Sequence, residues 1–232
     1  MLKVEGIRAG YDESMVLNDV SLQAEIGKVT AVLGRNGVGK STLIKTIAGL
    51  IKPAGGSIKW MDERIEKKAP EFRARSGIAY VPQGREIFSA LTVEENLLLG
   101  LEALPRKERK ELPGEIFEWF PILSEMIHRK GGDLSGGQQQ QLAIARAIVG
   151  RPKMLLLDEP MEGIQPSIVQ LIQEVIIDIA SKQGMGVILV EHSLDLAFAC
   201  ADYYYILDHG KVVSEGITDT VHKDLVKQHL II

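Results

Sequence analysis

Eight consecutive residues in the first fifth of the chain constrain its fold more than any others. Residues 34–41 read Gly-Arg-Asn-Gly-Val-Gly-Lys-Ser and follow Val29–Leu33, an apolar run of strand length. Glycines at this spacing leave backbone amides free to point at a phosphate, and a helix that starts near Lys40 turns its positive end toward the same place. The pattern therefore predicts a strand, a phosphate-binding loop and a helix, in that order.

Polar side chains in this loop suit the binding of a nucleoside triphosphate. Lys40 has the length to reach the β and γ oxygens, and the Ser41 hydroxyl is a suitable ligand for Mg²⁺. The alternative is a glycine-rich turn that only lets helix and sheet pack closely, and it leaves these two residues unexplained. The residues expected to contact the nucleotide here are Gly34, Arg35, Asn36, Gly37, Val38, Gly39, Lys40, Ser41 and Thr42.

The composition is that of an ordinary globular protein rather than a nucleic-acid binder. The 232 residues carry a formal net charge of −4, with 45% hydrophobic and 25% charged residues, so there is no basic excess. We therefore expect no nucleic acid partner. The single cysteine, Cys200, stands among apolar residues; it cannot form an intrachain disulfide framework and suits a reducing compartment.

Apolar periodicity predicts an α/β fold class. The first thirty residues alternate as an antiparallel strand does, with Val20, Leu22 and Ala24 on one face, and a further short strand is expected near Ser57–Trp60. Later strands alternate with helical stretches, which is the rhythm of a parallel sheet. They are expected at Ile78–Val81, Met154–Leu157 and Val187–Val190. We therefore expect a parallel-sheet core beside an antiparallel β subdomain.

The pattern changes between Gly84 and Arg151, where long helical stretches are punctuated by prolines and glycines and no strand pattern is visible. We interpret this part as an inserted helical subdomain. The sequence thus predicts a single domain, residues 1–232, with a nucleotide-binding core at 1–83 and 152–232 and the insertion at 84–151. Length alone also permits a division into two domains.

Turn signals near the C-terminal end predict a hairpin. Tyr203–Leu207 and Lys211–Ser214 flank the triplet 208–210, which reads Asp-His-Gly. A final helix is expected to pack Val226 and Leu230 inward. Apolar runs are everywhere too short for a membrane span, so we expect any membrane role to come through a partner chain.

A pair of carboxylates follows one of the predicted buried strands. Met154–Leu157 is followed by Asp158 and Glu159, which we expect beside the phosphate loop of a neighbouring strand. Asp158 is then suited to the metal shell, and Glu159 to act as the general base that orients and deprotonates the attacking water. The alternative is an acidic strand end without a chemical role.

A second helix N-terminus carries small polar residues. Ser135, Gly136, Gly137 and Gln138 precede a helix with apolar residues at helical spacing. They predict a second anion cradle. Two structural alternatives stay open: a serine cap worth about 1 kcal/mol, and a solvated helix face for the glutamine run 138–141.

The phosphate loop, Leu134–Gln138 and the strand Met154–Glu159 occur in an order and at separations that resemble the ATP-binding cassette (ABC) family, over nearly the whole chain. The resemblance implies the P-loop ABC ATPase fold, ATP and Mg²⁺ as ligands, and ATP hydrolysis coupled to transport. It also implies that two cassettes pair head to tail, so that Ser135 and Gly137 of one complete the γ-phosphate site of the other. A lone chain should then hydrolyse ATP poorly.

Three further positions match functional residues of the family. Tyr11 matches the aromatic residue that stacks on adenine, Gln83 the loop glutamine that senses the γ-phosphate and contacts the metal, and His192 the switch histidine that contacts the γ-phosphate. Without the resemblance each has a plainer interpretation, as a packing aromatic, a strand-end residue and a structural histidine.

Two positions depart from the commonest family pattern. Met161 stands where threonine or serine is frequent, and Gln165 stands where aspartate is frequent. These differences leave open how the two sites of a pair communicate. Met161 is interpreted as a filler of an apolar gap, since a thioether tolerates irregular packing.

Finer resemblances point to one group of importers. Gln83–Phe88 and Leu91–Leu98 are similar to ATPases that serve importers of branched-chain amino acids, urea and short-chain amides. Ser135–Leu142, with its four successive glutamines, and Glu162–Pro166 are similar to the urea branch. The resemblance implies urea as the cargo, with a branched-chain amino acid or a short-chain amide as the alternative.

The same resemblance implies the partners and the location of the chain. It implies a second ABC ATPase subunit, identical or related, with a heterodimer favoured. Membrane permease subunits and, through them, a substrate-binding protein complete the expected assembly. The chain is then expected at the cytoplasmic face of the plasma membrane, held there by these partners.

Three other classes of protein share parts of the pattern. A nucleic-acid-associated cassette ATPase has the same motifs but usually adds a second cassette, coiled-coil arms or basic extensions. A switch GTPase needs an Asn-Lys-x-Asp segment, which this sequence lacks. A nucleotide-binding scaffold without turnover does not explain Glu159 and His192.

Overall fold

The computed structural model describes residues 1–12, 14–109, 111–221 and 223–228. Within them, six strands form a sheet in the order β10-β9-β3-β8-β7-β6 and four form an antiparallel sheet in the order β2-β1-β4-β5, which confirms the α/β fold class. The strands are β1 (Leu2–Tyr11), β2 (Ser14–Ala24), β3 (Val29–Leu33), β4 (Gly55–Trp60), β5 (Glu63–Arg64), β6 (Ile78–Val81), β7 (Met154–Asp158), β8 (Gly186–Glu191), β9 (Tyr203–Asp208) and β10 (Lys211–Ile217). The helices are α1 (Lys40–Ala48), α2 (Pro70–Arg75), α3 (Val93–Gly100), α4 (Glu115–Trp119), α5 (Pro121–Glu125), α6 (Gly136–Val149), α7 (Pro166–Ser181), α8 (Leu194–Phe198) and α9 (Lys223–Lys227).

The central strands β3, β8 and β7 of the larger sheet are buried on both faces. Val32 belongs to the apolar cluster around α1, whereas its neighbours Ala31 and Leu33 belong to the cluster that includes α6 and α7. Strands β9, β3, β8, β7 and β6 run parallel, and β10 is antiparallel to β9. A sheet covered on both sides needs apolar residues at every position, which explains the continuous apolar runs in the sequence.

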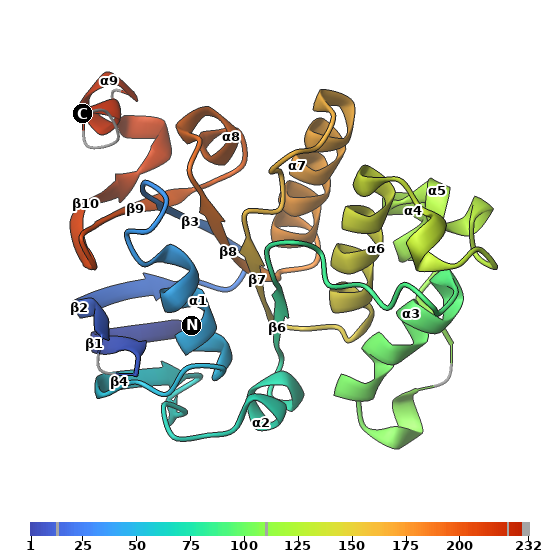
Figure 1. Ribbon diagram of the computed structural model, residues 1–232, viewed down its shortest axis with the longest axis horizontal. Helices are drawn as coiled ribbons and strands as arrows, with labels where there is room; N and C mark the ends of the chain where they lie inside the picture. Colours follow the sequence, from blue (N-terminus) through green and yellow to red (C-terminus); the bar gives the residue numbers. More distant parts are fainter. Residues whose placement is uncertain (13, 110, 222, 229–232) are drawn as a thin grey trace.

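Helix α1 lies between the two sheets (Figure 1). Its residues Leu43, Ile44 and Ile47 are at most 1% exposed and share one cluster with residues of both sheets. The predicted inner face of β2, which carries Val20 and Leu22, is buried in the same cluster. Packing on both sides therefore fixes the first turn of α1 and the loop that leads into it.

Between residues 84 and 151, the described residues form helices joined by loops. These helices include α3, α4, α5 and α6, which lie beyond the β6 edge of the parallel sheet, with α6 beside α7 (Figure 1). The apolar residues predicted along α6, including Leu142 and Ala145, are buried as expected. The division of the chain into a core and an inserted subdomain stays a prediction.

The predicted hairpin near the C-terminal end is present. Strands β9 and β10 pair through a turn in which His209 has φ 43° and Gly210 has φ 72°. Val226 of α9 is 2% exposed, as expected, and Leu230 lies outside the described residues. Among the helices of the described residues, none has both the length and the apolar character that a bilayer span requires.

A buried guanidinium closes the C-terminal end of α1. Arg73 of α2 is 2% exposed, and its Nη1 donates hydrogen bonds of 2.8 Å to the carbonyl oxygens of Thr46 and Ile47. Its Nε donates to the carbonyl oxygen of Lys68 at 3.1 Å. Burial lowers the pKa of this guanidinium. The contact links α2 to carbonyl groups that have no donor within their own helix.

Replacement of this guanidinium is expected to weaken the fold. Arg73→Met keeps most of the apolar stem but removes the donors to the carbonyls of Ile47 and Lys68, while the Thr46 carbonyl keeps only the Gly49 amide at 3.2 Å. We therefore expect the free energy of unfolding to fall by about 2–4 kcal/mol. Arg75→Met, at an exposed position of the same helix, is the control and should change it by less than about 0.5 kcal/mol. Urea denaturation measures both; equal effects would contradict the assignment.

Candidate active site

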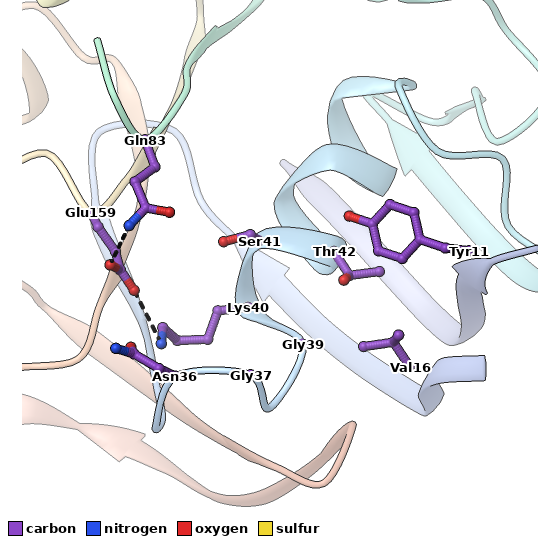
Figure 2. A pocket seen from close by; sticks show the side chains of 10 residues that line it. All are labelled: Tyr11, Val16, Asn36, Gly37, Gly39, Lys40, Ser41, Thr42, Gln83 and Glu159. Atoms are coloured by element: carbon purple, nitrogen blue, oxygen red, sulfur yellow. Dashed lines mark hydrogen bonds and ion pairs between the residues drawn. The ribbon is translucent and has the colours of Figure 1, made fainter. Parts of the chain in front are cut away.

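A cavity of about 430 Å³ lies at the N-terminal end of α1, between the phosphate loop and the antiparallel sheet. Its lining consists of Tyr11, Val16, Asn36, Gly37, Gly39, Lys40, Ser41, Thr42, Gln83 and Glu159. All of these except Val16 were expected from the sequence. Figure 2 shows Lys40, Glu159 and Gln83 together at one side of the cavity and Tyr11 with Val16 at the opposite side.

Two glycines give the loop its path. A Cβ atom at Gly34 would lie 2.4 Å from the carbonyl oxygen of Leu207, and Gly39 has φ 112° with a Cβ position 2.8 Å from a methyl group of Leu17. The first helical hydrogen bond of α1 runs from the amide of Leu43 to the carbonyl oxygen of Gly39 at 2.9 Å. Earlier amides of a helix have no acceptor within it, and they favour an anion at this end.

Lys40 places a buried cation beside the cavity. Its Nζ donates to the carbonyl oxygens of Gly34 at 2.9 Å and Arg35 at 3.0 Å, and lies 3.2 Å from Oε1 of Glu159. The side chains of Lys40 and Glu159 are 3% and 6% exposed. An ion pair with so little solvent is weakly screened, so an incoming phosphate competes with Glu159 for this cation.

Ser41 and Asp158 are in contact although β3, the strand before the phosphate loop, and β7, the strand that ends at Asp158, are not neighbours. We expected a neighbouring strand, but β8 lies between β3 and β7 in the sheet. The Ser41 hydroxyl bridges the gap from α1 and donates to Oδ1 of Asp158 at 3.1 Å, while the Tyr80 hydroxyl donates to Oδ2 at 3.4 Å. Burial raises the pKa of Asp158, the Ser41 hydrogen bond opposes the rise, and nearby Glu159 adds to it. Burial and the Asp158 charge also raise the pKa of Tyr80, so its hydroxyl stays a donor.

Glu159 is held by Gln83 and Lys40, and His192 lies nearby. Nε2 of Gln83 donates to Oε2 of Glu159 at 3.1 Å and to Oε2 of Glu162 at 2.7 Å, and Lys40 pairs with the other Glu159 oxygen. His192 Nδ1 lies 4.0 Å from Oε2 of Glu159, too far for a hydrogen bond. The structure therefore brings the three predicted catalytic residues together; their roles stay predictions.

The oxygen ligands here fit a magnesium ion in part. Among the described residues, no group of three or more His, Cys, Asp or Glu side chains is arranged to hold a metal. Ser41 and Asp158 supply two oxygens within 3.1 Å of each other, and Gln83 lies on the same side of the cavity. Mg²⁺ commonly takes one or two protein ligands and completes its shell with phosphate oxygens and water.

The second predicted cradle lies apart from this cavity. Ser135 caps α6: its Oγ accepts from the amide of Gln138 at 3.4 Å, and Oε1 of Gln138 accepts from the amide of Ser135 at 2.9 Å. Ser135, Gly136, Gly137 and Gln138 line a different cavity of about 580 Å³, together with residues 163–165. Ser135 therefore does cap α6, and the anion cradle stays a prediction. A solvated face is wrong for Gln140 and Gln141, which are 4% and 2% exposed.

The other predicted residues have varied surroundings. Tyr11 is 48% exposed at the edge of the cavity, which favours a contact surface over a packing role. Val38 packs against the cluster around α1, and Arg35 is exposed. Met161 is 3% exposed within the apolar core, as expected of a gap filler, and Gln165 stands exposed at the start of α7.

Sequence reasoning missed four residues near the site. Val16 lines the cavity, and Glu162 shares the Gln83 amide with Glu159. Tyr80 holds Asp158, and Glu191 ends the buried strand β8. Only Glu191 carried a usable signal, because an acidic residue after a wholly apolar strand is the same pattern that pointed to Asp158.

The profile of the ABC transporter family matches residues 17–162, more than half of the chain, and the chain belongs to this family. The chain is 39% identical over 213 residues to the high-affinity branched-chain amino acid transport ATP-binding protein BraG of Pseudomonas aeruginosa, covering 92% of this chain and 91% of that protein. It is 36% identical to the probable branched-chain amino acid transport ATP-binding protein LivF of Archaeoglobus fulgidus, covering 93% and 92%. It is 35% identical to the lipopolysaccharide export system ATP-binding protein LptB of Haemophilus influenzae, covering 97% and 93%.

Solved structures of ABC cassettes have the same fold. The ADP conformation of one ATP-binding cassette of an ABC transporter superposes with a TM-score of 0.84 at 30% identity, covering 99% of this chain and 97% of that chain. A dimeric post-hydrolysis cassette bound to ADP and Pi gives 0.83 at 26% identity, covering 94% and 99%. This chain is therefore an ATP-hydrolysing subunit of an ABC transporter.

Loss of the Glu159 carboxylate is expected to stop hydrolysis while ATP still binds. Glu159→Gln keeps the shape of the side chain but cannot accept a proton, so we expect ATP turnover by the assembled transporter to fall about 100-fold or more. Glu162→Gln is the matched control, because it changes the other carboxylate that accepts from Gln83, and should alter turnover only a few-fold. Equal rates for wild type and Glu159→Gln would remove Glu159 from this role.

Proposed function

We propose that the chain energises an importer of small, mostly uncharged metabolites, and that urea is the cargo. Support for the importer group comes from BraG and LivF, whose names assign them to branched-chain amino acid transport. Support for urea comes from the resemblance of Ser135–Leu142 and Glu162–Pro166 to the urea branch. The alternative cargo is a branched-chain amino acid or a short-chain amide.

The single observation that carries the proposed mechanism is the cluster of Lys40, Glu159 and Gln83 at one side of the cavity. The triphosphate is gripped by amides at the start of α1, and Lys40 exchanges its ion pair with Glu159 for the phosphate oxygens. Glu159 is thereby freed to orient water for in-line attack and to accept its proton. Tyr11, across the cavity, offers an exposed ring for the adenine.

We propose Ser41, Asp158 and Gln83 as the residues that hold Mg²⁺. A bound magnesium ion supplies positive charge to the phosphate oxygens that become more negative during transfer. The buried carboxylate of Asp158 and the hydroxyl of Ser41 are hard oxygen ligands, and magnesium sites commonly use one or two such protein ligands. His192, half-exposed beside Glu159, is placed to contact the γ-phosphate.

A second cassette completes the site in this proposal. The cradle at Ser135–Gln138 lies outside the cavity of its own chain, so it is available to close over the triphosphate held by a partner. The solved dimeric cassette bound to ADP and Pi is consistent with such pairing. A related chain is favoured as the partner over an identical one.

Membrane subunits are proposed to dock beside the Gln83 loop. Phe88, Leu98 and Leu99 are large apolar residues that are 40–53% exposed there, and the Arg146 guanidinium lies 5.1 Å from the centre of the Phe88 ring. A cavity of about 390 Å³ runs between this ring and β6. An apolar helix of a permease subunit fits this surface, and it would hold the chain at the cytoplasmic face of the membrane, with a substrate-binding protein reached through the permease.

Transport of labelled cargo tests the proposal directly. In vesicles that contain the permease subunits, both ATPase subunits and the binding protein, we expect ATP-dependent uptake of labelled urea and little uptake of leucine. Glu159→Gln in this chain should remove most of that uptake, because it removes the proposed base. Leucine uptake without urea uptake would contradict the urea assignment. Uptake of none of urea, leucine and a labelled short-chain amide would contradict the importer.

Charge at the start of α6 tests the trans arrangement. Gly137→Asp adds a carboxylate to the first turn of α6, with its Cβ 3.2 Å from Cγ1 of Ile168. ATPase activity of the assembled transporter should then fall by half or more, because the new charge repels the phosphate of a partner. ATP affinity of the isolated chain, measured by calorimetry, should not change, since the two cavities are separate. Gly114→Asp, an exposed glycine with open space around it at the start of α4, is the control. Loss of ATP binding by Gly137→Asp in the isolated chain would contradict pairing in trans.

A further inference from the structure

Glu191 is a fully buried carboxyl group that the proposed mechanism does not use. It ends β8, is 0% exposed, and its Oε1 accepts from the amide of Met161 at 3.3 Å. Its Oε2 has no hydrogen-bond partner among the described residues. A buried polar atom without a partner is costly, so its persistence calls for a reason.

The surroundings of Glu191 connect it to the active site. Glu159 faces it from the end of β7, Lys40 from α1 and Cys200 from the segment after α8. His192 Nδ1 lies 3.9 Å from Oε2 of Glu191 and 4.0 Å from Oε2 of Glu159. One imidazole nitrogen therefore stands between two carboxylates, beyond hydrogen-bond distance of both.

The charge of Glu191 is finely balanced. Burial raises its pKa to about 7, and the negative charge of Glu159 contributes to the rise. The backbone amides of Met161 and His192 oppose it, and so, to a smaller extent, does the charge of Lys40. These opposing influences make the protonation of Glu191 sensitive to a change of charge close by.

A triphosphate brings such a change. Its negative oxygens pair with Lys40, which is the cation that opposes protonation of Glu191. A magnesium-bound triphosphate keeps a net negative charge, so it also adds negative charge beside Glu159. Both effects favour the neutral carboxyl group. In that form, Oε1 still accepts from Met161, and the hydroxyl at Oε2 becomes a donor that faces His192 Nδ1.

We propose that Glu191 is a positioning residue that gains a proton from solvent at Oε2 when a triphosphate binds, and that the new hydroxyl draws His192 Nδ1 from its present 3.9 Å to hydrogen-bond distance for hydrolysis. The step is a proton transfer alone: one O–H bond forms on Glu191 as one breaks in hydronium or a buffer acid. The inference depends on the proposed nucleotide site. It assigns Glu191 an indirect role, because this side chain lines no part of the nucleotide cavity.

Calorimetry can count this proton. A non-hydrolysable ATP analogue is titrated with Mg²⁺ into the full chain at pH 7, in buffers of different ionisation enthalpy, and the slope of heat against that enthalpy gives the protons taken up. Because the bound triphosphate favours the neutral carboxyl group, wild type should take up more protons, by a fraction of one per chain, than Glu191→Gln. Glu215→Gln, an exposed control on β10, should match wild type. Equal slopes for wild type and Glu191→Gln would overturn the inference, whereas absence of binding heat in wild type would overturn the nucleotide site itself.

Two further readouts separate positioning from a purely structural role. ATPase activity of the assembled transporter should fall as pH rises through the pKa of Glu191, which gives the pH profile an alkaline limb. This limb should lie at higher pH for kcat than for kcat/KM, because bound triphosphate favours the protonated form of Glu191. Glu191→Gln should lose the limb. If that variant does not fold, infrared difference spectra of wild type carry the test: a carboxylic acid C=O band must appear on nucleotide binding, and its absence would overturn the proposal.

Discussion

The seating of α1 between two sheets is the constraint on which the rest of the site depends. Apolar side chains of this helix pack on both sides, so its first turn cannot shift without opening a core. The loop before it is equally confined, since Gly34 passes so close to Leu207 that no side chain fits. Rigid amides and a rigid cation follow from this packing, and preorganised groups of this kind are what phosphate binding and transfer require.

The position of each residue relative to the buried sheet explains why Asp158, Glu191 and Glu159 differ in their partners and in the charge state that burial favours. Asp158 and Glu191 end buried parallel strands, whereas Glu159, one residue further along, turns out with φ 48° to meet Lys40 and Gln83. Burial favours the neutral form of the first two. Glu159 instead has a cation and an amide as partners. Three carboxyl groups within a small volume therefore acquire separate tasks from their positions alone.

Much of this arrangement could be predicted from the sequence because strong local patterns encode it. The apolar runs at β6, β7 and β8 gave their positions within a residue or two, and the glycine loop gave the start of α1. The strand order was harder to predict, because an apolar run does not show which strand it pairs with. In the structure, β8 lies between β3 and β7. Long-range contacts such as that of Tyr80 with Asp158 depend on this order and have no local signal.

The ion pair between Lys40 and Glu159 has a consequence for selectivity. The Glu159 carboxylate is held 3.2 Å from the Lys40 ammonium group, so its effective concentration there is very high. Any dissolved anion must displace this carboxylate in order to bind Lys40. A monovalent ion such as chloride carries too little charge to displace the Glu159 carboxylate from Lys40 in a site with so little water. A polyvalent chain of phosphates offers several contacts at once. We therefore expect the ion pair to select polyvalent anions by their charge, before the fit of a ligand to the cavity contributes to selectivity.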